Sequence, residues 1–325
     1  MKILYLPIME TGSVHDIAFA QKRGLYTALA KAGHSVVEYD YLNWCSREWF
    51  GTEILMSLLG HFDPDLIISQ FHGPDILTPE RIHELKNSYN PNMRWVNWSG
   101  DSWAHSLTAQ PILDMAREFD LQLVAAPDCL PVYEAAGINA AYWNIALERP
   151  VGKLPDMPTY DVVFLANVIN DKRLALMKFL KSLDVRVGIY GDWSEADGRN
   201  VYNFAEGEVL YRNATIAIAD NVYQDTQNYI SNRPMQIMAA GGAICLHQHV
   251  PKMKELSGWD AGRHYIEWFD LDDLGKTIQY LLKVGKSVDY QHMVSNAQKH
   301  VLEHHTWEAR VNQLFNQFLP AMEKA

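Results

Sequence analysis

Short apolar runs alternate along the chain with longer segments in which apolar residues return every three or four positions. Runs of four or five apolar residues between turn residues are typical of strands that are buried on both faces of a parallel sheet. Their alternation with helical segments predicts a doubly wound α/β sheet. In the first half, strands are expected at Lys2–Ile8, Ser35–Asp40, Asp65–Gln70, Met93–Trp98, Leu121–Ala125 and Ala140–Ile145.

The pattern is interrupted once and then starts again. Glu148–Pro158 contains three prolines and little apolar periodicity, which is typical of a boundary between domains. Further strands are expected at Tyr160–Ala166, Val185–Tyr190, Thr215–Ala219, Ala243–Leu246 and His264–Trp268. The sequence therefore predicts two Rossmann-like domains that face each other across a cleft, at 1–150 and 151–305. The last segment, 306–325, is predicted to be a helix that crosses back to the first domain.

Ligands of such sheets bind beyond the carboxyl ends of the strands, so the loops there are the candidate sites. The first loop, ETGSVHD, is not a GxGxxG motif, although Gly12 and Ser13 could let backbone amides approach a ligand. In the second half, the strand that ends at Tyr190 and Gly191 leads into a loop where a planar base could stack.

The strongest local motif is the segment 211–249, which reads as strand, polar loop, helix, Gly-Gly and strand. The helix begins at Asn232 and Arg233. A helix N-terminus presents unpaired N–H groups, and an arginine adds a two-pronged donor, so a phosphate-bearing ligand is one interpretation. The alternative is an ordinary βαβ unit in which Arg233 lies on the surface. Gly241 and Gly242 follow the helix where a positive φ is needed.

A second cationic motif follows the first strand of the second half. The turn that begins at Asn167 leads into a helix with Lys172 and Arg173 in its first turn. Cations at this end oppose the helix dipole, so we expect an anion to offset them. The alternative is two solvated surface charges.

Asp101 is the candidate general base. It follows the strand Met93–Trp98 beside a glycine and close to Trp98, Trp103 and His105. Apolar surroundings raise the pKa of a carboxyl group toward a useful range. The alternative is that Asp101 caps the next helix.

Composition and charge narrow the class of protein. The net charge of −11 argues against a broad nucleic-acid-binding surface, and the three cysteines without a CxxC motif fit a reducing compartment. The sequence has no apolar run long enough to span a membrane, so a soluble cytoplasmic protein is expected. His247 and His249 could share one face of a strand and bind zinc, but no third ligand is indicated and no metal is predicted.

The second half resembles GT-B glycosyltransferases. The resemblance rests on RPMQIMAAGG, on HYIEWFDLDDLGKTIQYLL and on His305-Thr306-Trp307-Glu308-Ala309-Arg310. The CgeB-like, spore-maturation branch, with its R-x-F-E-x-x-A-x-G and H-T-x-x-x-R motifs, is the most similar. The layout is more distantly similar to bacteriophage DNA β-glucosyltransferase.

This resemblance implies roles for individual residues. Arg233 would bind the donor diphosphate, Arg173 would be a second phosphate contact, and Gln236 would bind the donor ribose where the family has Glu. Asn228 stands where retaining members have another Glu, so an inverting, metal-independent displacement is expected, with Asp101 as base. A nucleotide-diphosphate sugar, preferably a UDP-sugar, is the expected donor substrate, and no tightly bound cofactor is expected.

Other functions remain open from the sequence. Gln236 and Asn228, which replace carboxylates, would also suit a GT-B protein that binds a nucleotide sugar or phosphoglycan without catalysis. The acceptor could be a glycan, a small molecule or a modified base of DNA, although the acidic balance disfavours DNA. An epimerase of the same architecture would need paired acids near the donor sugar.

Overall fold

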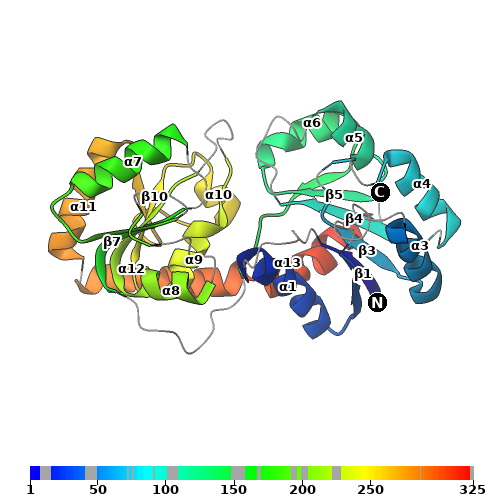
Figure 1. The fold of residues 1–325 in the computed structure, drawn as a ribbon, viewed down its shortest axis with the longest axis horizontal. Helices are drawn as coiled ribbons and strands as arrows, with labels where there is room; N and C mark the ends of the chain where they lie inside the picture. Colours follow the sequence, from blue (N-terminus) through cyan, green and yellow to red (C-terminus); the bar gives the residue numbers. More distant parts are fainter. Residues whose placement is uncertain are drawn as a thin grey trace. The chain divides into compact units, whose positions relative to one another are not determined.

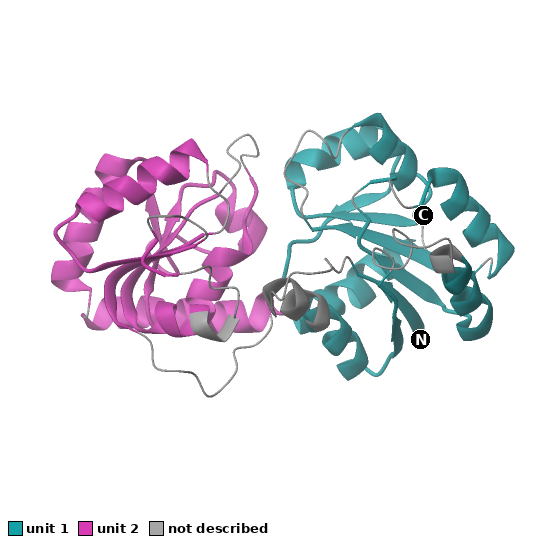
Figure 2. Ribbon diagram, viewed as in Figure 1, with its two compact units in different colours: residues 1–14, 18–146, 307–325 teal, residues 15–17, 147–306 magenta. Residues whose placement is uncertain are grey.

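The computed structural model contains two α/β units (Figures 1 and 2). Unit 1 comprises residues 1–14, 18–146 and 307–325, and unit 2 comprises residues 15–17 and 147–306. The structure describes residues 1–7, 16–40, 50–71, 73–74, 77–90, 92–100, 109–147, 158–166, 170–191, 196–198, 204–221, 228–285 and 287–322. Within these ranges, the side chains of 16–23, 50–52 and 204–206 are not described.

Unit 1 is built on a parallel six-stranded sheet in the order β2-β1-β3-β4-β5-β6. Alternate residues of its strands point to opposite faces, and each face has its own apolar core. The strands are β1 (Lys2–Leu6), β2 (Ser35–Glu38), β3 (Leu66–Ser69), β4 (Arg94–Ser99), β5 (Leu121–Val124) and β6 (Ala140–Tyr142). The helical segments are α1 (Asp16–Lys31), α3 (Phe50–Phe62), α4 (Pro79–Ser88), α5 (Gln110–Ala116), η2 (Pro127–Cys129) and α6 (Leu130–Ala135).

The C-terminal segment belongs to the core of unit 1. It consists of α13 (Trp307–Gln313), a π-helical stretch η3 (Leu314–Phe318) and α14 (Leu319–Met322). Trp307 is 1% exposed and packs against Trp98 and Trp143. Its ring lies so close to Gly24 of α1 that a Cβ there would be 2.2 Å from it. Glycine is therefore required at this contact.

Unit 2 has a parallel five-stranded sheet in the order β11-β10-β9-β7-β8. Helices α7 and α11 cover one face of this sheet, and α8 and α9 lie on the other (Figure 1). The strands are β7 (Tyr160–Leu165), β8 (Val187–Tyr190), β9 (Ala214–Ala219), β10 (Ile244–Gln248) and β11 (Ile266–Trp268). The helices are α7 (Asp171–Ser182), α8 (Phe204–Arg212), α9 (Asn232–Ala240), α10 (Met253–Ser257), α11 (Leu271–Val284) and α12 (Val288–His304).

The ends of unit 2 lie side by side. Leu147 N donates to His305 O over 2.8 Å, and Leu147 forms a parallel bridge with Thr306. His305 is fixed in turn because its Nε2 donates to Ser257 O over 2.8 Å. The two points at which the chain enters and leaves unit 2 are thus hydrogen-bonded to each other.

The predicted fold class, two Rossmann-like parallel sheets, is confirmed. Gly241 takes the positive φ of 70° that the sequence predicted for the end of its helix. At Gly242 the constraint is a close approach instead, since a Cβ would lie 2.2 Å from Arg212 O. No helix within the described ranges is long and apolar enough to cross a membrane.

Candidate functional site

The candidate site lies at the carboxyl edge of the unit 2 sheet. The first turns of α7 and α9 both begin there, after β7 and β9 respectively. Asn170 caps α7 by accepting from Arg173 N over 2.9 Å. Ser231 occupies the cap position of α9, but its side chain makes no capping bond. Each of these helix N-termini is suited to an anion, because it presents unpaired N–H groups and the positive end of the helix dipole.

A buried carboxylate, Asp220, connects the two helices. It directly follows β9 and is 1% exposed. Arg173 Nε and Nη2 lie 2.7 Å from Oδ2 and 3.0 Å from Oδ1 of Asp220, respectively. Arg233 Nη1 lies 2.7 Å from the same Oδ1 and 3.0 Å from the Asp220 carbonyl oxygen. The structure therefore brings together two residues, Arg173 and Arg233, that the sequence analysis selected from separate motifs.

The charges around Asp220 determine its ionisation. Burial raises the pKa of Asp220, but the charges of Arg233 and Arg173 and the hydrogen bonds from Arg173 outweigh it and hold the pKa below its usual value. Asp220 is thus ionised at neutral pH. Together, Arg173, Asp220 and Arg233 carry a net charge of about +1, because two guanidinium groups meet one carboxylate.

Lys172 adds a further cation to this edge. Its Nζ donates to Gln248 Oε1 over 2.6 Å, a neutral partner at the end of β10. Burial and the neighbouring Arg173 lower the pKa of Lys172. The anion that the sequence analysis expected near Lys172 and Arg173 is present for Arg173, as Asp220. Within the part of the chain that the structure describes, Lys172 forms no ion pair and is hydrogen-bonded to Gln248.

The exposure of the two arginines differs. The Arg173 side chain is 1% exposed, and its fork is directed to Asp220. The Arg233 side chain is 13% exposed and also lies over the Phe164 ring, 5.8 Å from its centroid. These contacts leave little of Arg173 to meet a ligand and argue against the direct phosphate contact expected for it, whereas Arg233 stays accessible at the edge.

Two buried polar atoms next to the α9 N-terminus have no hydrogen-bond partner among the residues that the structure describes. They are Asn221 Oδ1 and Ser231 Oγ, which flank the loop between β9 and α9. Asn221 is 7% exposed, and its amide nitrogen donates to Tyr229 O over 2.8 Å. Buried polar atoms usually have partners, so these two are suited to a ligand that hydrogen-bonds at the helix N-terminus.

Four other predicted residues lie within the described ranges: Asn232, Gln236, Tyr190 and Gly191. Asn232 and Gln236 lie on the first turns of α9 and are partly exposed. Tyr190 is 8% exposed, and its hydroxyl lies 2.9 Å from that of Tyr160. A Cβ on Gly198 would be 2.4 Å from the Tyr190 ring, which shows how closely the ring is packed. Gly191, which follows it, is also buried. The loop where a base was predicted to stack continues into residues 192–195, outside the described residues, so the ligand contacts of Tyr190 and Gly191 stay predictions.

Four predicted residues lie outside the described residues: Gly12, Ser13, Asn167 and Asp101. The framework that precedes Asp101 is described. Asn97 in β4 accepts from Ser69 Oγ and Phe71 N and donates to Gln122 Oε1, with distances of 2.8, 2.8 and 2.9 Å. This buried amide ties the carboxyl ends of β3, β4 and β5 together just before the Asp101 loop.

The two histidines of the HxH motif have separate surroundings. His249 stacks on Phe269 and lies 3.2 Å from Glu267. His247 is fully buried and its Nδ1 donates to Gln248 O, while its Nε2 has no partner in the described parts of the chain. Within the described ranges, no group of three or more His, Cys, Asp or Glu side chains is placed to hold a metal ion.

His247 should make unit 2 sensitive to acid. Burial lowers its pKa to about 4 from the usual 6.5. Its contribution to stability is therefore complete above pH 6.5 and is lost as the pH falls toward 4, because the unfolded chain binds the proton first. The loss amounts to roughly 3 kcal/mol. Urea unfolding of His247→Gln should lack this part of the pH dependence, and the exposed His292→Gln should retain it; equal slopes in both variants would contradict the assignment.

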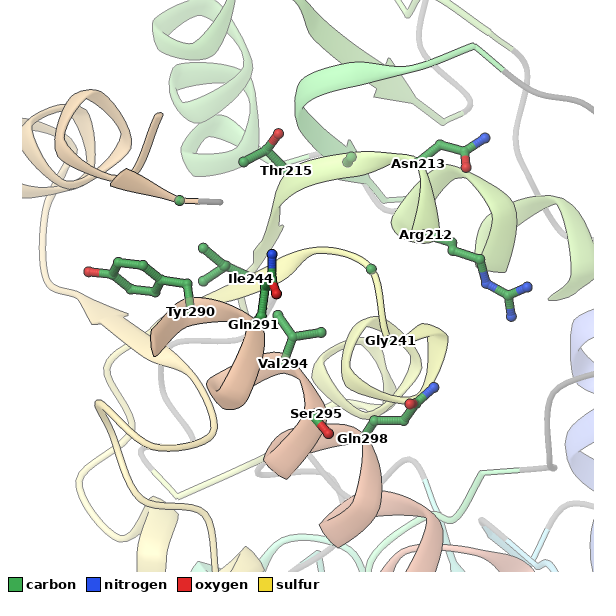
Figure 3. A pocket seen from close by; sticks show the side chains of 13 residues that line it. Arg212, Asn213, Thr215, Gly241, Ile244, Tyr290, Gln291, Val294, Ser295 and Gln298 are labelled. Carbon is green, nitrogen blue, oxygen red and sulfur yellow. The ribbon is translucent and has the colours of Figure 1, made fainter. Parts of the chain in front are cut away.

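One pocket of unit 2 lies away from this edge. A pocket of about 410 Å³ opens at the amino ends of β9 and β10, between the C-termini of α8 and α9 and the helix α12 (Figure 3). Arg212, Thr215, Gly241, Gln291 and Gln298 are among its lining residues. Helix C-termini present carbonyl oxygens and negative dipole ends, so this pocket is not suited to a phosphate.

The chain is similar to known glycosyltransferases in part of its sequence and in its fold. Residues 172–316 match a family model described as glycosyl transferase-like. No functionally curated protein matches the sequence. Among solved structures, sucrose-phosphate synthase from Thermosynechococcus elongatus is similar with a TM-score of 0.65 at 13% identity, covering 100% of both chains.

Two further structures have the same architecture. HepE from Anabaena, solved in complex with UDP and glucose, gives a TM-score of 0.62 at 11% identity and covers 99% of this chain and 100% of its own. A glycosyltransferase from Rickettsia africae gives 0.60 at 10% identity, with 100% and 99% covered. The chain thus has the GT-B fold. The glycosyl transferase-like match covers less than half of the chain, within the second half of this fold.

Proposed function

We propose that the protein transfers a sugar from a nucleotide-diphosphate sugar to an acceptor hydroxyl, and that the carboxyl edge of unit 2 binds the donor. The observation that carries this proposal is the cationic edge: Arg233 and Lys172 lie at the first turns of two helices, and the buried carboxylate Asp220 is paired with Arg233 and Arg173. A diphosphate supplies the negative charge that this edge lacks.

A UDP-sugar is the donor we favour. HepE, which shares the fold, has been solved with UDP and with UDP-glucose. In our proposal, Arg233, Lys172 and the N–H groups of α9 bind the diphosphate. Asn232 and Ser231 lie beside it, and Asn221 Oδ1 is an acceptor for the nucleotide. Gly12 and Ser13 of unit 1 and Asn167 of unit 2 keep the ligand-binding roles predicted from the sequence.

The proposed reaction is a direct displacement without a metal ion. Asp101 takes the proton from the acceptor hydroxyl, the acceptor oxygen attacks the anomeric carbon, and the bond from that carbon to the diphosphate oxygen breaks. Arg233 and Lys172 stabilise the negative charge that develops on the departing diphosphate. A single displacement inverts the anomeric centre. The acceptor is a glycan or a small molecule, and a modified base of DNA is the alternative.

The decisive experiment measures binding and turnover together. Calorimetry with UDP, GDP, ADP and their glucose conjugates should identify one nucleotide that binds. A ligand at 100 times its Kd should also stabilise the folded protein by about 2.7 kcal/mol in thermal unfolding. Release of the free nucleoside diphosphate in the presence of acceptors would then demonstrate transfer. If no nucleoside diphosphate binds, the proposal is wrong.

A sugar-nucleotide sensor is a second candidate because Gln236 stands where the resembling family has a carboxylate. Binding of the intact nucleotide sugar, with neither hydrolysis nor transfer across an acceptor panel, would favour the sensor.

Gln236 should distinguish the nucleoside part of the donor from its phosphates. The side chain lies one turn after Arg233 on α9 and is partly exposed. If it binds the ribose hydroxyls, Gln236→Ala should weaken UDP binding by about fivefold, the cost of one neutral hydrogen bond, and leave pyrophosphate binding unchanged. Gln279→Ala on α11 is the control. Equal weakening of UDP and pyrophosphate would contradict the ribose role.

A further inference from the structure

Arg173 and Asp220 are more buried than residues that bind a substrate need to be. Both side chains are 1% exposed, and they form an ion pair with a distance of 2.7 Å from Nε to Oδ2. We propose that Asp220 and Arg173 are a positioning pair, which fixes the guanidinium of Arg233 for the donor diphosphate without contacting the donor. This inference rests on the proposed function, because it assigns to Arg233 the diphosphate contact.

The geometry accounts for the positioning. One nitrogen of Arg233, Nη1, donates to both the carboxylate and the backbone carbonyl of Asp220, over 2.7 and 3.0 Å. The two contacts come from one residue at the end of a central strand, and they fix the direction of the guanidinium plane. The hydrogen bonds that Arg233 donates to described residues use Nη1, and Nε and Nη2 are left for a ligand.

The role of Arg173 follows from the charge. Asp220 alone would fix Arg233 but would also neutralise it, and a neutral pair attracts a diphosphate only weakly. The second guanidinium restores a net charge of about +1 to the group, and its bidentate contact satisfies both carboxylate oxygens. A buried ion pair is a poor source of stability because of its desolvation penalty, so stability alone does not explain this arrangement.

The charge-removing variant Asp220→Asn separates positioning from simple electrostatics. The substitution makes the group more positive, so electrostatics alone predicts tighter binding of UDP and of pyrophosphate. Positioning predicts the opposite. We expect Asp220→Asn to weaken both by about tenfold and to leave uridine binding unchanged, since uridine lacks the phosphates. Within an Arg233→Ala background, Asp220→Asn should have no further effect on either ligand.

Glu208→Gln is the matched control. Glu208 is also a buried carboxylate of unit 2 paired with an arginine, Arg212, but it lies near the C-terminus of α8. Its loss should lower the melting temperature without changing the affinity for UDP. Arg173→Lys is the second test variant; it keeps the charge and loses the bidentate contact, and it should weaken UDP binding by about threefold.

The outcomes are distinct. Tighter UDP binding by Asp220→Asn, equal weakening of uridine and UDP, or an undiminished effect in the Arg233→Ala background would each overturn the positioning role. If Asp220→Asn does not fold, Arg173→Lys decides, and an unchanged affinity for UDP overturns the inference. If the wild-type protein binds neither UDP nor pyrophosphate, the proposed function has failed and the inference fails with it. If wild-type binding is normal, any failure concerns the positioning pair alone.

Discussion

Replacing Asp101 with asparagine should reduce kcat for sugar transfer by about 100- to 10,000-fold, the usual contribution of a general base. Asparagine has nearly the same shape as aspartate but cannot accept the acceptor's proton. The donor is bound by unit 2 in our proposal, so its affinity should stay unchanged. The measurement is the steady-state rate of UDP release with acceptor, together with calorimetry of UDP.

A control variant tests whether the loss of activity is specific to Asp101. Gly100 precedes it at the end of β4, where a Cβ would lie 2.8 Å from the Trp98 ring, so the chain there is closely packed. The control, Asp128→Asn, removes another carboxylate of unit 1, in η2, and should have full activity. Full activity in Asp101→Asn would remove the proposed base. A loss of UDP affinity equal to the loss of rate would instead give Asp101 a part in donor binding.

Replacing Arg233 with alanine should weaken UDP binding by about 100-fold, since a charge-assisted, two-pronged contact with a phosphate contributes roughly 2–3 kcal/mol. The rate of transfer should fall at least as far, because the negative charge on the diphosphate increases when the bond to the sugar breaks. The buried pair of Arg173 and Asp220 remains balanced in this variant, so unit 2 should stay folded.

Arg263→Ala is the control for this variant, because Arg263 is an exposed arginine of the same unit. It should bind UDP as the wild type does. Melting temperatures of both variants, measured without ligand, show whether folding is affected. Equal UDP affinity in Arg233→Ala and the wild type would contradict the assignment of the diphosphate site.

The architecture could be predicted from the sequence because its signals are local. Buried parallel strands are continuous apolar runs, and those runs are found in the described strands to within a few residues; β9, for example, spans Ala214–Ala219 where Thr215–Ala219 was expected. The glycine after α9 was predicted for the same reason, since only a local positive φ requires it. The position of Arg233 in the first turn of α9, at the carboxyl edge of the sheet, could also be predicted from the sequence.

The partners of the site residues could not be predicted. Arg173 and Asp220 are 47 positions apart, and the side on which Arg173 leaves the first turn of α7 depends on the packing of that helix. The rule that selected Asp101, an acid directly after a central strand, also applies to Asp220 and could have found it. The packing of the Tyr190 ring against Gly198 also could not be predicted, because it depends on how the loop after β8 folds back.

The H-T-x-x-x-R motif that carried the resemblance has structural contacts in this chain. His305 donates to Ser257 O, and Arg310 Nε donates to Asn144 O over 2.9 Å. The CgeB-like branch and the relation to the phage enzyme stay predictions.

The hydrogen bond between Leu147 and His305 has a consequence for how the gene can be rearranged. Because residues 147 and 306 are neighbours, the segment 147–306, which is all of unit 2 except residues 15–17, is a continuous insertion into unit 1. A short glycine-serine bridge from Ala146 to Trp307 should therefore yield the host as a free-standing protein that keeps its C-terminal helix. The excised insert should fold from a single uninterrupted stretch of chain.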